Sequence, residues 1–220
     1  MKTTTTILIA LGLVCCASSH APASMLTFEL GGPEFSGSGA NAIAEDAVVL
    51  TFDDSVGPNE VRLTVTFNGG EGVDDTAKLN DLVFNVDTTI SSFAYVSGVS
   101  AIASSPSYLL DGHGVDGSKG YDVLFNYPPP GDSGTFTVGL DSVYDILGAG
   151  LVASSFDLTN QLGYGPLHAA VHINAVDNGN SGHYGDTEGN GIIPEPSSFL
   201  VWGIGLLGCG VYFRRRRFRA

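Results

Sequence analysis

The sequence predicts an all-β protein built around a single, jelly-roll-like β-sandwich domain. Between residues 24 and 177, apolar and polar residues alternate with a period of two in many short runs, which is typical of strands with one buried face. Turn-forming Gly, Asn, Asp and Pro residues separate these runs, and no segment has the apolar period of an amphipathic helix. About ten short strands without helices are expected to pack as two facing sheets.

The clearest alternation lies at 61–67, where Val61, Leu63 and Val65 interleave with polar residues. Leu82 and Phe84 begin a second run of the same kind. Further strands are expected at 26–30, 47–52, 92–96, 121–125, 135–140, 142–147, 154–158 and 169–176. Pairs such as Asp111-Gly112 and Asp116-Gly117 are typical of the turns between them.

The segment 178–193 differs from the rest of the domain in composition. It is rich in Gly and Asn and has no apolar periodicity. Such a composition favours a flexible linker, so we expect the acidic β-sandwich domain to cover 24–177 and the linker to follow it.

The domain is strongly acidic. Of the 23 acidic residues, only Glu195 lies outside 24–193, whereas the only cations in that range are Arg62, Lys78 and Lys119. A surface of this charge repels the phosphate backbone, so we expect no nucleic-acid partner. The three cysteines lie in the terminal segments, at positions 15, 16 and 209, which excludes disulfides and thiolate metal sites from the domain.

Residues 1–23 have the three parts of a secretory signal peptide. Lys2 supplies the positive charge, an apolar core runs over 7–16, and small residues follow it. Ala21 and Ala23 form the small-x-small pattern that signal peptidase recognises, so we expect cleavage after Ala23. The apolar core alone is too short to span a bilayer.

The segment 194–220 combines four features in a fixed order. A short motif, Pro194, Glu195 and Pro196, precedes an apolar run over 197–213, which is long enough as a helix to cross a thin bilayer. A cluster of arginines follows immediately before the last residue: Arg214, Arg215, Arg216, Arg217 and Arg219. By the positive-inside rule, we expect this cluster to stay in the cytoplasm while the domain lies in the periplasm.

This tail closely resembles the PEP-CTERM sorting tail of exported bacterial proteins. The resemblance implies that an exosortase in the inner membrane recognises Pro194, Glu195 and Pro196 and processes the chain near them. It also implies a host that makes extracellular polysaccharide, and a product that moves from a transient membrane anchor to the cell surface or beyond. The same tail has been catalogued as a C-terminal domain of ice-binding proteins, a label that does not by itself imply ice binding.

Two short patterns offer alternative chemistries. The sequence Gly131-Asp132-Ser133-Gly134 is similar to the nucleophile motif of chymotrypsin-like proteases, but position 135 is Thr where that family has Gly. His168 and His172 are spaced to share one face of a strand, as two zinc ligands would. Thr64 and Thr66 form an isolated Thr-x-Thr pair, which is too little for the regular array that ice binding requires.

We expect no cofactor, although the acidic loops contain ligands of the kind that calcium takes. Its candidate ligands are Asp111, Asp116 and Asp122, with the acidic pairs Asp53-Asp54 and Asp74-Asp75 as further candidates. The interpretation that we favour over calcium binding is a solvated acidic surface with aspartates in turns.

We therefore expect a non-enzymatic structural or interaction protein associated with exopolysaccharide or biofilm matrix. The alternative is a carbohydrate-binding module that presents aromatic rings to a glycan. The tyrosines available for that role are Tyr108, Tyr121, Tyr127, Tyr144 and Tyr164. A secreted hydrolase is less favoured, because no catalytic constellation is evident in the sequence.

Overall fold

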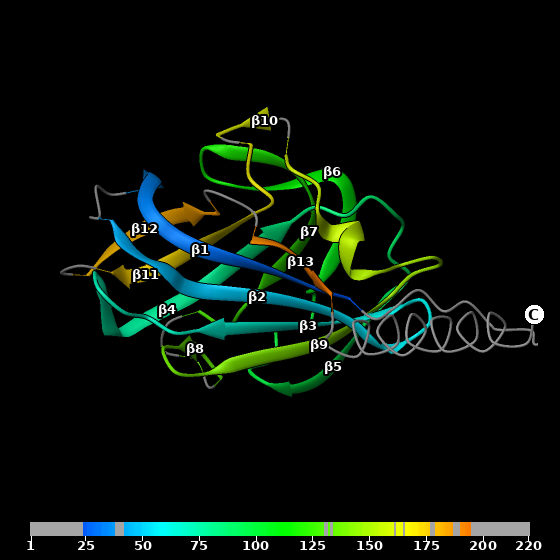
Figure 1. Ribbon diagram of the computed structural model, residues 1–220. Helices are drawn as coiled ribbons and strands as arrows, with labels where there is room; N and C mark the ends of the chain where they lie inside the picture. Colours follow the sequence, from blue (N-terminus) through cyan, green and yellow to red (C-terminus); the bar gives the residue numbers. More distant parts are fainter. Residues whose placement is uncertain are drawn as a thin grey trace, which may run out of the picture.

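The fold is almost entirely antiparallel β-structure (Figure 1). The computed structural model describes residues 24–37, 42–129, 132, 134–160, 162–164, 166–176, 179–186 and 190–194. Within these ranges no helix is long and apolar enough to cross a bilayer. The predicted signal peptide and the predicted membrane helix at 197–213 lie outside the described residues.

One layer of the sandwich, called sheet A below, has the strand order β13-β1-β2-β3-β9-β5. Its strands are β1 (Ser24–Gly37), β2 (Ile43–Gly57), β3 (Glu60–Phe67), β5 (Ser92–Gly98), β9 (Asp141–Leu147) and β13 (Asn190–Pro194). The facing layer, sheet B, contains β4 (Val73–Phe84), β6 (Ser107–Val115), β7 (Ser118–Asn126), β8 (Phe136–Thr137), β10 (Leu162–Gly163), β11 (Ala169–Val176) and β12 (Asn180–Gly185).

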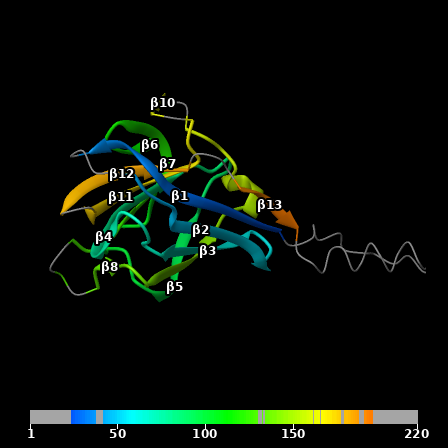
Figure 2. The ribbon, with the colours of Figure 1, turned by 60° about the vertical axis from the view of Figure 1, so that its left-hand side comes forward.

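Strand β1 connects the two layers into one curled sheet (Figure 2). Its first half pairs with β2, and its second half pairs with β12 of sheet B. The register shifts near Gly31, where a side chain would overlap the backbone carbonyl of Ala44 on β2. A glycine at this position therefore allows β1 to turn from one layer into the other.

The core lies between the layers and is rich in phenylalanine. Phe52 from sheet A stacks on Phe156 with ring centroids 4.1 Å apart, and meets Phe84 from sheet B edge-on at 5.3 Å. All three side chains are fully buried. These contacts across the interface confirm the predicted β-sandwich, since the two inner faces pack directly against each other.

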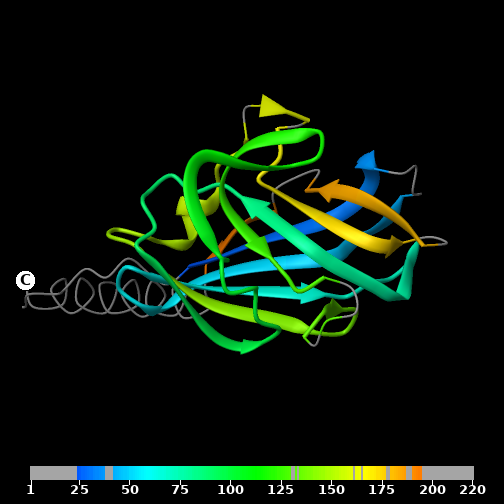
Figure 3. The same cartoon turned by 180° about the vertical axis from the view of Figure 1, so that it is seen from behind.

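A second, smaller core covers the outer side of sheet B. Val83 on β4 and Ala170 on β11 form a buried cluster there with Tyr121 and Val115 of the β6–β7 hairpin. Figure 3 shows this hairpin in green against the back of the sandwich. Sheet B is therefore buried on both faces in this region, which explains why several of its strands are apolar on both sides.

The prediction of a flexible linker at 178–193 is wrong. This segment contributes two strands, and β12 lies in the interior of the sheet between β11 and β1. Gly182 and Gly185 leave room for the ring of Tyr184 and the methyl groups of Leu167, which occupy the space a side chain would need. The glycine content thus serves close packing, and the domain extends to Pro194 instead of ending near 177.

Other expected strands differ in detail. The run at 154–158 is a single 3-10 turn, η1 (Ala153–Phe156), and the run at 135–140 is reduced to the two residues of β8. The sequence predicts a turn at Asp111-Gly112, but β6 runs through this pair. Asp111 has a φ of 51°, so the strand continues through a residue in the left-handed region.

Candidate functional site

The two predicted processing points meet at one edge of sheet A. Ser24, the residue after the predicted signal cleavage, is the cross-strand partner of Pro194, the first residue of the predicted sorting motif. Met25 and Ile193 form the next pair along the same two strands. The first and last described residues of the domain therefore lie side by side, and β13 ends at the first residue of the predicted sorting motif.

A single carboxylate fixes the beginning of β1. The Ser24 backbone N–H donates to Asp54 Oδ1 at 2.5 Å, and the Ser24 hydroxyl donates to Asp54 Oδ2 at 2.8 Å. Asp54 Oδ2 also accepts the backbone N–H of Ala153 at 3.1 Å, at the start of η1. The sequence marks Asp54 only as a further calcium candidate, because its contacts with Ser24 depend on pairing between β1 and β2.

The remaining residues of the predicted sorting signals lie outside the described residues. These are Ala21, Ala23, Glu195, Pro196 and the arginine cluster Arg214, Arg215, Arg216, Arg217 and Arg219. Of the recognition motif, the structure describes the backbone of Pro194 alone, as the last residue of β13. The roles of these residues remain predictions.

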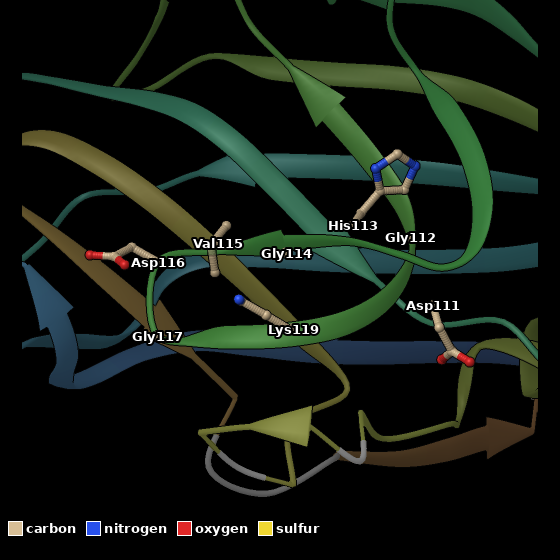
Figure 4. A pocket seen from close by; sticks show the side chains of 8 residues that line it. All are labelled: Asp111, Gly112, His113, Gly114, Val115, Asp116, Gly117 and Lys119. Atoms are coloured by element: carbon tan, nitrogen blue, oxygen red, sulfur yellow. The ribbon is translucent and has the colours of Figure 1, made fainter.

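The three aspartates predicted as calcium ligands do not come together. Asp122 is buried, and its two oxygens accept the backbone N–H groups of Asp111 at 2.8 Å and Val86 at 3.1 Å. Figure 4 shows the carboxylates of Asp111 and Asp116 at opposite ends of the hairpin, pointing away from each other. No group of three potential metal ligands occurs among the described residues. Asp122 therefore acts as a structural acceptor for the backbone.

The same hairpin encloses a shallow hollow of about 380 Å³, lined by residues 111–117 and Lys119 (Figure 4). His113 lies in it, and its Nε2 is 3.3 Å from the hydroxyl of Ser107. Burial lowers the pKa of His113, so the ring is neutral at neutral pH. A serine beside a neutral histidine resembles part of a hydrolase site.

In the part of the chain that the structure describes, His113 has no hydrogen bond to an acid, which would be the third member of such a site. The acidic residue whose charge acts on His113 is Asp122, but both of its oxygens are taken by backbone N–H groups. The serine of the protease-like motif, Ser133, lies outside the described residues. The hydrolase interpretation thus gains a Ser–His contact, but no acid among the described residues orients this histidine.

The two histidines whose spacing would suit zinc have separate partners. His168 Nδ1 lies 2.6 Å from the buried carboxylate of Asp186, and its Nε2 lies 3.2 Å from Asp157. The hydrogen bond to Asp186 and the charges of both aspartates raise the pKa of His168. His172 instead points its Nδ1 toward Asp81 at 3.3 Å. The i to i+4 spacing alone does not predict these different surroundings.

Two neighbouring strands bring together a pair of histidines that the sequence does not indicate. His172 on β11 and His183 on β12 are cross-strand partners, and their rings stack with centroids 4.4 Å apart. His183 Nδ1 lies 2.9 Å from the carbonyl oxygen of Ser36. Burial, together with the charge of His172, lowers the pKa of His183. No local signal identifies this pair, because the composition around His183 is that of a linker.

The tyrosines do not form the aromatic platform that a planar glycan-binding face needs. Tyr121, Tyr127 and Tyr144 are buried in the two cores, and burial raises the pKa of Tyr121 to about 12. Tyr108 packs against the main core, whereas Tyr164 is exposed and stacks on Phe35. The five rings are therefore divided between interior and surface.

The outer face of sheet A is polar and contains a row of threonines. Thr27, Thr51 and Thr64 are in direct register across β1, β2 and β3, and all three are partly exposed. Beside this row, Arg62 on β3 makes a bidentate ion pair with Asp145 on β9, at 2.8 and 3.0 Å. Thr64 looks isolated in the sequence, since the sequence alone does not give the register of neighbouring strands.

Comparison with family models, with curated proteins and with solved structures finds no match to this chain. The resemblance of the tail to a sorting signal therefore rests on its own residues and stays a prediction.

Proposed function

We propose that this chain is an exported cell-surface or matrix protein, sorted by an exosortase, with a non-enzymatic structural or interaction role linked to exopolysaccharide or biofilm. Signal peptidase removes residues 1–23, and the tail holds the domain at the inner membrane with the sandwich in the periplasm. The exosortase then acts near Pro194, Glu195 and Pro196, and the domain reaches the surface.

One observation supports this proposal above the others. Ser24 and Pro194 are cross-strand partners, so the residues next to the two proposed processing points lie together at one edge of the sandwich. A membrane enzyme that approaches this edge reaches both ends of the domain without crossing the rest of the fold. The acidic composition of the domain also suits a protein that stays in solution outside the cytoplasm, because a high net charge opposes association between copies of the protein.

The test is intact mass spectrometry of the protein recovered from its native host, for the wild type and a Glu195→Ala variant. We expect a wild-type mass that begins at Ser24 and ends near Pro194, and a variant mass that keeps the tail. Glu188→Ala, which removes a neighbouring acid upstream of the motif, serves as the matched control and should be processed as the wild type. A wild-type mass that extends to Ala220 would refute exosortase sorting.

A second candidate function, carbohydrate binding, is favoured by the threonine row on sheet A. Neighbouring strands are about 4.8 Å apart, so the row presents hydroxyl groups at a regular spacing on the sheet surface. Hydroxyl groups and the Arg62–Asp145 pair are suited to hydrogen bonds with sugar hydroxyls. In this function the glycan would lie across the strands and would not need the buried tyrosines.

The measurement is calorimetric titration of the protein with exopolysaccharide purified from the host. We expect Thr51→Val, which keeps the shape of the central threonine, to weaken binding, whereas Thr76→Val on β4 of the other sheet should not. Equal binding by both variants, or no binding by the wild type, would count against the threonine row as a glycan site.

A further inference from the structure

The contacts of Ser24 are unusual for the first residue of a strand. Its backbone nitrogen and its hydroxyl both point at one carboxylate, that of Asp54, at 2.5 and 2.8 Å. The site is partly buried and joins residues that are far apart in the chain. An ordinary β-ladder needs no side-chain carboxylate at this position, since backbone carbonyls satisfy the N–H groups of paired strands.

Asp54 is held in place independently of Ser24. The N–H of Ala153, which has no partner within η1, donates to Asp54 Oδ2 at 3.1 Å. The neighbouring Asp53 is occupied elsewhere, because its Oδ1 accepts the backbone N–H of Ser55 at 2.8 Å. The carboxylate of Asp54 is thus positioned by η1 and available at the start of β1.

Removal of the predicted signal peptide changes the chemistry of the Ser24 nitrogen. In the uncleaved chain it is a neutral amide with one hydrogen to donate. Cleavage after Ala23 converts it into an α-amino group, which carries three hydrogens and a positive charge below its pKa of about 7.7–8.0. A charged donor facing a carboxylate forms a hydrogen bond roughly twice as strong as a neutral donor.

We propose that Asp54 is the binding site for the α-ammonium group of Ser24 in the processed protein. This rests on the proposed function, because only cleavage after Ala23 creates that group. The ion pair forms at the end of β1 that pairs with β13, and Ser24 lies directly opposite Pro194. Signal-peptide removal therefore tightens the edge that presents the sorting motif.

The experiment compares three forms of the chain that differ only at the N-terminus, purified in detergent with the tail intact and melted at pH 6.5. One form begins at Ser24, released from a fusion by a protease that leaves no extra residue. The second is the same chain acetylated at Ser24, and the third begins at Ala23. We expect the free Ser24 form to melt about 3 °C above the other two, which lack an ammonium group at the Ser24 nitrogen.

Asp54→Asn keeps the size of the side chain and removes its charge, so it should abolish the difference between free and acetylated Ser24. Asp53→Asn is the matched control and should preserve the difference, since Asp53 bonds Ser55 instead. Equal melting of the free and acetylated forms of the wild type would overturn the proposal, even if Asp54→Asn failed to fold. A difference that persists in Asp54→Asn, or one that Asp53→Asn also abolishes, would overturn it as well.

These results are separate from the test of export. If the native protein does not begin at Ser24, the proposed cleavage after Ala23 is wrong, whatever the melting experiment gives. If the native protein begins at Ser24 but the free and acetylated forms melt at the same temperature, the proposed cleavage stands and only the proposed role of Asp54 is wrong.

Discussion

Replacing Asp186 with asparagine tests the cluster of hydrogen bonds just after β12. The buried carboxylate accepts the backbone N–H groups of His168 and Ala169 at 2.8 and 2.9 Å, and its other oxygen lies 2.6 Å from His168 Nδ1. The His168 ring also stacks on Phe28, with centroids 4.8 Å apart. The substitution preserves the shape of the side chain and removes the charge that faces the histidine.

The expected loss of unfolding free energy follows from weakening the bond between residue 186 and His168. The amide of the Asp186→Asn variant would still offer one oxygen to the two backbone donors, so the main loss is the charge-assisted bond to His168, worth about 2 kcal/mol of unfolding free energy. The His168 side chain is only 17 % exposed, so solvent screens this bond little. Asp157, which lies 3.2 Å from His168 Nε2, is half exposed and contributes less.

The direction in which stability changes with pH follows from the direction in which the pKa of His168 is shifted. The hydrogen bond to Asp186 and the nearby negative charges raise the pKa of His168 in the folded protein. The stabilisation is therefore fully present below the unfolded pKa of histidine, about 6.5, and is lost as the pH rises through the higher folded pKa. The wild type should exceed the Asp186→Asn variant in stability by more at pH 6 than at pH 9.

Urea unfolding at pH 6 and pH 9 measures this difference for the wild type and the variant. Asp157→Asn is the control for a general loss of negative charge near His168, and its effect should be smaller. An equal loss of unfolding free energy at both pH values for Asp186→Asn would contradict this expectation, since the loss would then be independent of the charge on His168.

The remaining predictions concern a buried acceptor, the core and calcium. Asp122→Ala leaves the N–H groups of Asp111 and Val86 without their acceptor, and should lower the unfolding free energy by about 2–4 kcal/mol in urea titrations; a loss below about 0.5 kcal/mol would contradict the role given to this carboxylate. Phe52→Ala removes a fully buried ring that stacks on Phe156, and should cost about 3–5 kcal/mol by the same method. Calcium at millimolar concentration should not shift the melting temperature through the three candidate aspartates, because their carboxylates do not converge, and an upward shift that Asp111→Asn abolishes would show otherwise.

The strands that the sequence predicts well are those whose pattern is complete within one segment. Strand β11 spans the expected 169–176, and β3 covers the alternating run at 61–67. In β3 one face lies in the core and the other is partly exposed. Apolar and polar residues therefore alternate with a period of two within this segment. The prediction at 154–158 is wrong because a few apolar residues do not distinguish a strand from a 3-10 turn that buries Phe156.

Strand β12 shows where local pattern is insufficient. Its residues are mostly small or polar, and its place in the sheet comes from neighbours on both sides, β11 and β1. The glycines that indicate a linker are needed because Tyr184 and Leu167 occupy the adjoining space. No property of the segment alone contains this information, since its position depends on strands elsewhere in the chain.

The all-β class and the linear patterns that predict export and sorting can be recognised in the sequence alone, because alternation, small-residue cleavage sites and arginine clusters are local. Which residues meet depends on the tertiary structure. It places Ser24 opposite Pro194 and beside the carboxylate of Asp54, separates the aspartates considered as calcium ligands, and buries three of the five tyrosines considered for glycan binding. These outcomes depend on strand register and on the packing of two sheets, which join residues that the chain itself keeps far apart.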